Sequence, residues 1–544
     1  MSQTSIKTLR DSAGMRWTAL LLLALAMFCS YVFMDILSPI KDLMQETRGW
    51  DSASFGRMQG AEVFLNVYVF FLIFAGIILD KMGVRFTAVL SGAVMLFGGF
   101  IKFYACSDAF VGTSLEAWFN SHLNWDGDIP IIGTILPFAE GMPASAKLAA
   151  LGFMFFGCGC EMAGITVSRG IVKWFKGRET ALAMGSEMAL ARLGVATCMI
   201  FSPYFARLGG GVHVDNAVKF GVVLLCIALI MFIVYFFMDK KLDAQTGEAE
   251  EKDDPFKISD LGKIFSSLGF WLVALLCVLY YSAIFPFQKY AVNMLQCNLD
   301  LTPADPNTFW GKEAVTWVQY LLMLVVAAGS FSSNFIKKNK GLKYGLMGVA
   351  IIALIVYCYM GYMRGTAETI FAVFPLLAVA ITPILGNYVD HKGKAASMLM
   401  LGSILLVICH LTFAFVLPGV SAASAAGGVV VAYVTILVLG ASFSLVPAAL
   451  WPSVPKLVDE KIIGSAYAAI FWIQNIGLGL FPALIGLVLN KTNKEGAAAH
   501  ELDYTWALVM LAALGIAALL ISVYLKAVDK KKGYGLEEPN IKGE

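Results

Sequence analysis

The stretch LAALGFMFFGCGCEMAGITV, residues 148–167, is long enough to cross the hydrocarbon core of a bilayer and carries a single charge, Glu161. Similar apolar runs recur along the 544 residues, of which 59% are hydrophobic and 14% are charged. The sequence therefore predicts an all-α polytopic membrane protein surrounded by the lipid bilayer. A net charge of +2, with basic residues dispersed over the loops, argues against a nucleic-acid partner.

The apolar runs predict about fourteen membrane helices in two sets. We expect an N-terminal half at residues 1–238, a cytoplasmic linker at 239–265, a C-terminal half at 266–526 and a cytoplasmic tail at 527–544. The expected spans are 15–40, 56–80, 84–106, 147–171, 180–206, 217–238, 268–296, 314–336, 343–361, 366–388, 394–417, 426–452, 462–490 and 503–526.

Basic residues cluster in the loops on one predicted side of the membrane, among them Lys7, Lys81, Lys173, Lys240 and Lys392. Loops that carry an excess of Lys and Arg usually stay in the cytoplasm. Both termini are therefore expected there, and we expect the protein in a bacterial inner (plasma) membrane.

Two short turns share one pattern: GIILDKMGVR at residues 76–85 and GNYVDHKGK at residues 386–394. Each has Gly-x-x-x-Asp followed by basic residues around a second glycine. This repeated turn resembles the signature loop of the major facilitator superfamily, which joins helices two and three and recurs between helices eight and nine. The resemblance implies two pseudo-symmetric six-helix halves. Counting back from the second turn leaves 314–361 as an inserted two-helix hairpin.

Glu161 and Arg192 lie in consecutive predicted helices, about fifteen and sixteen residues from the turn between them, so they are expected at similar depth. Because charges in mid-membrane are costly, such a pair favours a functional site, although a permanent internal salt bridge is the alternative. Arginine suits a carboxylate and glutamate suits an ammonium group. The pair thus favours a zwitterionic ligand.

Four further segments carry a more specific resemblance: SYVFMDILSPI (30–40), WFKGRETALAMGSEMALARLG (174–194), FSLVPAALWPSVPKLV (443–458) and GSAYAAIFWIQNIGLG (464–479). They resemble the branch of the superfamily that contains lysosomal dipeptide transporters. In that family an acidic residue of the fourth helix receives the peptide amino group and an arginine of the fifth receives the carboxylate. Glu161 and Arg192 match those positions.

Other polar and aromatic residues at mid-depth are candidates for the cavity lining: Tyr31, Tyr281, Trp451 and Gln474. For the aromatic ones, packing or lipid contact is the alternative. Asp35, Glu62 and Lys289 fall toward the outer helix ends, where they are expected to form an outer gate or else to snorkel to the interface. Either carboxylate is also a candidate for proton coupling. Asp80, Arg85 and Asp390 are expected near the inner gate.

The chain has no nucleotide-binding GxxxxGK[ST] loop, no HExxH and no paired His or Cys ligands, so we expect neither an enzyme nor a cofactor nor a metal site. We expect a secondary transporter that moves a small zwitterion, such as a dipeptide, by alternating access and acts as a monomer. The alternatives are an organic-anion or sugar-phosphate carrier and a transport-inactive sensor on a carrier fold.

Overall fold

The computed structural model describes residues 8–126, 133, 136–176, 179–246, 258–299, 311–333, 336, 339–364, 366–458 and 463–539. Regular structure in this part of the chain is helical, apart from one isolated bridge between Trp125 and Ala139. The N-terminal half contains α1 (Ala13–Met34), α2 (Lys41–Arg48), α3 (Ser52–Gly60), α4 (Phe64–Tyr68), α5 (Phe71–Cys106), α6 (Ser114–His122), α8 (Ala144–Trp174), α9 (Thr180–Ala206) and α10 (Val214–Thr246).

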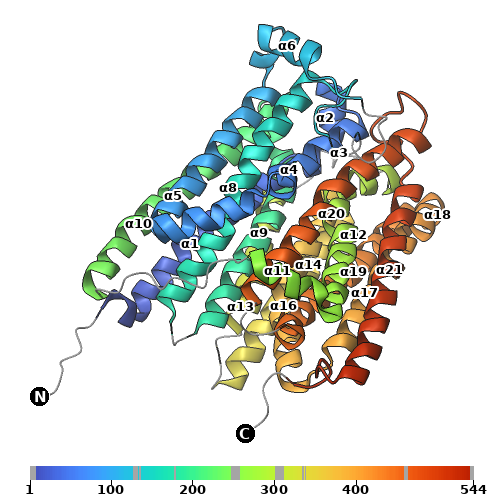
Figure 1. The fold of residues 1–544 in the computed structure, drawn as a ribbon. Coiled ribbons are helices and arrows are strands. Elements are labelled where there is room, and N and C mark those ends of the chain that lie inside the picture. The colour runs from blue at the N-terminus through green and yellow to red at the C-terminus, as the bar shows by residue number, and fades with distance from the viewer. Residues whose placement is uncertain are drawn as a thin grey trace, which may run out of the picture.

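The C-terminal half follows the short helix α11 (Ile258–Ser266). It contains α12 (Leu268–Leu299), α13 (Gly311–Ser333), α14 (Lys340–Arg364), α15 (Ala367–Phe371), α16 (Val373–Lys392), α17 (Ala395–Leu411), α18 (Leu417–Ala423), α19 (Ala425–Leu457), α20 (Ile463–Thr492) and α21 (Thr505–Lys532). Figure 1 shows the two halves as neighbouring bundles, coloured blue to green and yellow-green to red. We call the end that bears α6 the α6 end, and the opposite end, with the turns at Gly83 and Gly393, the signature-loop end.

The expected all-helical membrane fold is confirmed, and within the described residues twelve helices are long and apolar enough to cross a membrane. The difference from the expected fourteen arises in two places. The expected 56–80 span is divided among α3, α4 and the start of α5, and the label α5 also covers the next expected span, because two helices that meet at the Gly83 turn share it. The 314–336 span corresponds to α13 (Gly311–Ser333), which counts as a shorter apolar helix, Trp317–Ser333, when only the described side chains are considered.

The turn within α5 depends on glycine. Gly83 has φ 80° and ψ 167°, a conformation that side chains rarely adopt, so the chain reverses there although hydrogen bonding continues on both sides. The second turn is similar, because Gly393 has φ 72° and Lys394 has φ 64°. Both signature loops therefore reverse the chain by positive φ angles.

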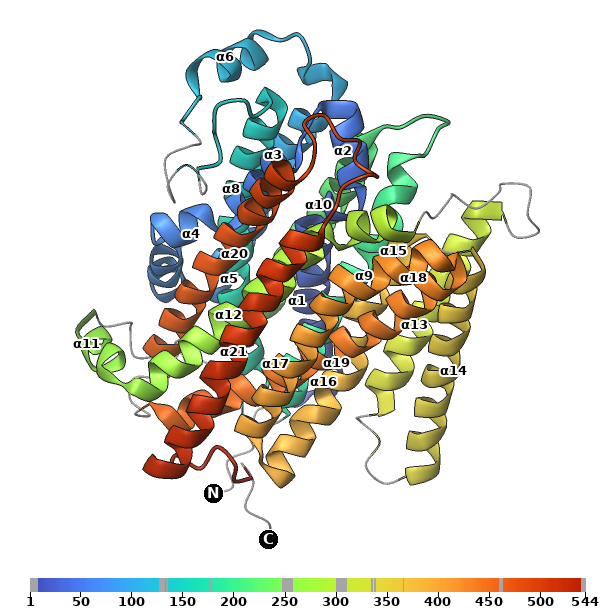
Figure 2. The ribbon, with the colours of Figure 1, turned by 90° about the vertical axis from the view of Figure 1, so that its right-hand side faces the viewer.

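The inserted hairpin, α13 and α14, lies at the edge of the molecule (Figure 2). Its first helix packs against α9 and α16, one from each half, while α14 stays on the outside. Ile352 and Ile355 on α14 are 63% and 61% exposed, as expected for side chains that face lipid.

The boundary helices extend beyond the expected spans. α10 continues to Thr246, into the expected 239–265 linker, and α21 continues to Lys532, into the expected tail. Residues 247–257 of that linker lie outside the described residues. The division into halves, linker and tail stays a prediction.

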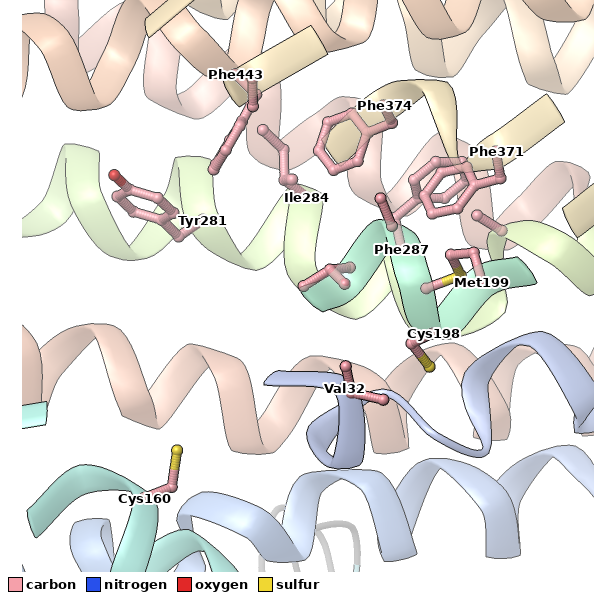
Figure 3. Packing of buried hydrophobic residues seen from close by; sticks show 14 of the residues in the cluster. Val32, Cys160, Cys198, Met199, Tyr281, Ile284, Phe287, Phe371, Phe374 and Phe443 are labelled. Atoms are coloured by element: carbon pink, nitrogen blue, oxygen red, sulfur yellow. The ribbon is translucent and has the colours of Figure 1, made fainter. Parts of the chain in front are cut away.

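Helix α3 of the first half packs closely on α20 of the second at the α6 end. A Cβ atom on Gly60 would lie 2.2 Å from the Gly479 carbonyl oxygen, and one on Gly486 would lie 2.1 Å from the Ser52 carbonyl oxygen. Small residues allow this approach of two backbones. Buried side chains of the two halves also meet at the seam. Figure 3 shows Phe287 and Phe371 of the C-terminal half near Met199 of the N-terminal half. The halves are therefore pressed together at the α6 end.

Candidate functional site

Arg192 projects from α9 into the seam between the halves, surrounded by aromatic rings. Its guanidinium carbon lies 5.9 Å from the ring centroid of Tyr31, 5.1 Å from that of Phe285 and 4.9 Å from that of Phe443. Tyr31 is on α1, whereas the other two rings belong to the C-terminal half. Cations are attracted to such ring faces, so these contacts hold the guanidinium without neutralising its charge.

Glu161 projects from α8 toward the other half and accepts a hydrogen bond from Asn475 on α20. The Asn475 Nδ2 atom donates to the Glu161 Oε1 atom over 3.0 Å. An amide donor orients a carboxylate without supplying a counter-charge. The negative charge of Glu161 thus faces the seam together with the positive charge of Arg192.

Among the described residues, no ion pair joins Glu161 to Arg192, and neither side chain forms one with another residue. The permanent salt bridge considered from sequence is therefore absent from this conformation. Both residues are partly exposed, and neither has a fully buried polar atom without a partner. Two opposite charges stand apart at the seam, each accessible to a polar ligand.

Aromatic side chains of the C-terminal half form a continuous wall beside Arg192. Tyr281 stacks on Phe285 with ring centroids 5.5 Å apart, and Trp451 stacks on Phe471 at 4.8 Å. Tyr281 also stacks on Trp451 at 6.3 Å, which connects the two pairs. Tyr281 and Trp451, expected from sequence to line the cavity, therefore belong to this wall, and Tyr31 faces it from α1.

Gln474 is oriented differently from the lining position expected of it. It is 8% exposed, and its Oε1 atom accepts from the Cys277 Sγ atom over 3.3 Å, which turns the amide toward α12. The next residue, Asn475, binds Glu161 instead. Successive helical residues point about 100° apart, so depth alone did not distinguish them. Asn475, Phe285 and Phe443 are the site neighbours that the sequence analysis missed.

Exposure along two helices shows the direction in which the seam is accessible. Met188 lies four residues from Arg192 toward the signature-loop end and is 53% exposed, and Phe471 lies four residues from Asn475 in the same direction and is 41% exposed. Residues four apart share a helix face. The seam beside the site is therefore less tightly covered toward the signature-loop end than toward the α6 end, where α3 and α20 are in backbone contact.

Asp35, Glu62 and Lys289, expected to form an outer gate, meet between the halves toward the α6 end. The Lys289 Nζ atom lies 2.8 Å from the Asp35 Oδ1 atom and 3.8 Å from the Glu62 Oε2 atom. Gln288 donates to the Asp35 Oδ2 atom over 2.6 Å. The side chains of Asp35 and Lys289 are only 1% and 8% exposed. These three residues therefore form a buried contact rather than snorkelling to the interface.

Asp80 and Arg85 lie at the signature-loop end and bind partners of their own half. Asp80 accepts from Arg169 of α8 over 2.8 Å, and Arg85 pairs with Asp243 of α10 over 3.2 Å. In the C-terminal half, Asp390 lies near the end of α16, and the backbone N–H of Lys394 in the same signature loop donates to the Glu537 carbonyl oxygen over 3.1 Å. Each signature loop is thus tied to a later segment of its own half.

Replacing Asp80 by Ala is expected to slow transport about tenfold while changing ligand affinity less than about threefold, because gate residues bias conformations and need not touch the ligand. Uptake into proteoliposomes and the dissociation constant of the purified protein measure the two effects. Asp108→Ala, which removes an exposed partner of Arg48 at the α6 end, is the matched control. An unchanged uptake rate for Asp80→Ala would argue against a gating role.

A sequence profile described as Major Facilitator Superfamily matches residues 23–367, more than half of the chain. The chain belongs to the major facilitator superfamily. It is an integral membrane protein with the fold of this superfamily.

Relatives within the superfamily support the resemblance noted in the sequence. The lysosomal dipeptide transporter MFSD1 of Danio rerio is 25% identical over 368 residues, which cover 66% of this chain and 64% of that protein. The protein of the same name from Homo sapiens is 23% identical over 368 residues, covering 66% and 63%. This major facilitator chain thus spans slightly less than two thirds of the length of these relatives.

Solved structures confirm the fold. Nucleoside transporter NupG matches with a TM-score of 0.57 and 11% identity over 93% of this chain and 99% of its own. A structure from a study of substrate recognition in proton dependent oligopeptide transporters matches with a TM-score of 0.54 and 12% identity over 95% and 99%. At these identities the likeness concerns the major facilitator fold alone.

Proposed function

We propose that this transporter moves dipeptides or similarly sized zwitterions by alternating access, with the peptide amino group at Glu161 and the carboxylate at Arg192. The single observation that carries this proposal is the pair of opposite charges that face one seam without an ionic partner. A zwitterion brings a counter-charge to each. The names of the MFSD1 relatives support the same class of solute.

The surroundings of the pair favour a small peptide with variable side chains. A guanidinium can bind a carboxylate through two parallel hydrogen bonds, which fixes one end of the ligand. The wall of Tyr281, Trp451 and Phe471 offers apolar surface between the fixed ends. Ligand sites commonly combine such apolar lining with a few placed polar groups.

The conformation described here suits one half of a transport cycle. The α6 end is closed by α3 and α20, and the seam beside the site is less tightly covered toward the signature-loop end. We propose that the signature-loop end faces the cytoplasm of a bacterial inner membrane, with both termini on that side, and that the monomer is functional. Rocking of the halves would then expose the site alternately to the two sides.

A thermal-shift screen of the purified protein tests the solute class. A ligand at about one hundred times its Kd stabilises the folded state by about 2.7 kcal/mol, so dipeptides are expected to raise the melting temperature and N-acetylated dipeptides to raise it less. Single amino acids, organic acids and sugar phosphates complete the panel. Stabilisation by organic acids or sugar phosphates without stabilisation by dipeptides would favour the anion carrier, and absent uptake of a stabilising dipeptide would favour the sensor.

A further inference from the structure

Lys102 is a buried lysine that the proposed transport site does not use. It lies on α5, is 0% exposed, and its Nζ atom has no hydrogen-bond partner among the described residues. The ammonium group sits over the Phe153 ring at 3.6 Å from the centroid and over the Phe33 ring at 5.3 Å. An intramembrane charge of this kind is costly and usually serves a function.

The gate residues lie close to this lysine. Glu62, Asp35 and Lys289 all act electrostatically on Lys102, and Lys289 approaches the same Phe153 ring at 5.9 Å. The backbone of Glu62 rests on α8 at Gly157, where a Cβ atom would lie 1.8 Å from the Glu62 carbonyl oxygen. Because Phe153 and Gly157 are four residues apart, they share one face of α8. The Lys102 ammonium group and the Glu62 backbone therefore contact residues of α8 that are about one helical turn apart.

The charges divide unevenly between the two halves. Asp35, Glu62 and Lys102 belong to the N-terminal half, whereas Lys289 is on α12 of the C-terminal half. In the closed conformation Lys289 contacts both carboxylates. When the α6 end opens, α12 carries Lys289 away and leaves two carboxylates with Lys102 as the nearby cation of their own half. Removing one partner of a buried ion pair is strongly unfavourable unless another group compensates.

We propose that Lys102 is the second partner of Glu62: it replaces Lys289 when the α6 end opens and so makes the open conformation accessible. In the closed conformation the Lys102 ammonium lies over the Phe153 ring. On opening it moves toward the Glu62 carboxylate by a change of side-chain rotamer. The exchange of one lysine for another keeps Glu62 paired in both conformations. This role rests on the two-state cycle of a carrier and not on the identity of the solute.

Hydrogen exchange of residues 52–60 in the ligand-free protein tests the proposal, because α3 is covered by α20 only while the α6 end is closed. Lys102→Met is expected to slow this exchange about tenfold, since the open conformation loses the partner of Glu62. Lys102→Arg keeps the charge and is expected to stay within about threefold of the wild-type rate. Adding Glu62→Gln to Lys102→Met is expected to restore most of the exchange, since residue 62 then needs no cation and Asp35 keeps the Ser38 hydroxyl, of its own half, as a donor over 3.2 Å.

A matched control distinguishes this pairing from a general effect of buried lysines. Lys147 on α8 is also buried, but its Nζ atom donates to the Asn124 Oδ1 atom over 2.6 Å. Lys147→Met is expected to lower thermal stability. If Lys147→Met also changes the hydrogen exchange of α3, adding Glu62→Gln is not expected to reverse that change. Unchanged or faster exchange in Lys102→Met, or no recovery with Glu62→Gln, would overturn the proposal. Failure of Lys102→Met to fold, both alone and together with Glu62→Gln, would overturn it as well.

Discussion

Arg192→Gln is expected to weaken dipeptide binding about thirtyfold or more, and Arg192→Lys about tenfold. Truncating one member of a buried, hydrogen-bonded charge pair costs about 2–5 kcal/mol, because the partner charge loses its compensation. Lysine keeps the charge but lacks the planar fork that binds a carboxylate through two bonds. It also interacts less well with the rings of Phe285 and Phe443 that flank the guanidinium.

The dissociation constant of the purified variants, determined by calorimetry with one dipeptide, measures this effect. Arg48→Lys is the control, because Arg48 pairs over 2.6 Å with the exposed Asp108, away from the site. A dipeptide whose carboxyl group is amidated adds a second control, since it is expected to bind wild type and Arg192→Gln with similar affinity. Equal losses for the free and amidated peptides would show that Arg192 supports the site without touching the carboxylate.

The contacts of Arg192 also suggest how binding is coupled to the cycle. Its guanidinium belongs to the N-terminal half, but two of its three rings belong to α12 and α19 of the C-terminal half. A carboxylate bound to this guanidinium would be linked to both halves, because Arg192 belongs to one half and contacts two rings of the other. Only a ligand that binds the two conformations with different affinity can shift their equilibrium. Arg192 lies where such a difference can arise.

The sequence predicted the membrane fold and the repeated signature turn, and it placed Asp35, Glu62 and Lys289 toward the outer helix ends while leaving open whether they form a gate or snorkel to the interface. Those features depend on local composition, on a glycine at a reversing turn and on depth along a helix, all of which the linear sequence records. It did not predict that 56–80 is divided among several helices. That division accompanies the close packing of α3 on α20, a tertiary contact through Gly60 and Gly486 that hydropathy does not contain.

Asn475 and Lys102 were missed for different reasons. Asn475 was passed over for Gln474 because counting residues from a turn gives depth but not the direction in which a side chain points. Lys102 lies close to the end of its predicted span, where a lysine ordinarily reaches the interface. Its burial follows from the approach of α5 to α8, where a Cβ atom on Gly152 would lie 2.7 Å from the Lys102 backbone nitrogen.

Glu161→Gln is expected to weaken free-amine dipeptides about tenfold while leaving N-acetylated dipeptides within about twofold, because only the former present an ammonium group to the carboxylate. The substitution is nearly isosteric. A glutamine Oε1 atom accepts from Asn475 as the glutamate oxygen does over 3.0 Å, so the contact between α8 and α20 is kept. The variant therefore removes the charge and little else.

The comparison of two ligands on two proteins isolates the interaction, since a general disturbance of the site weakens both peptides alike. Glu187→Gln is the matched control: this second carboxylate lies on α9, acts on the charge of Arg192, and has no assigned role toward the amine. It is expected to change the affinities of the free and acetylated peptides by the same factor. If Glu187→Gln discriminates between the peptides and Glu161→Gln does not, the ammonium group binds at Glu187, and the orientation proposed for the ligand is wrong although its zwitterionic character stands.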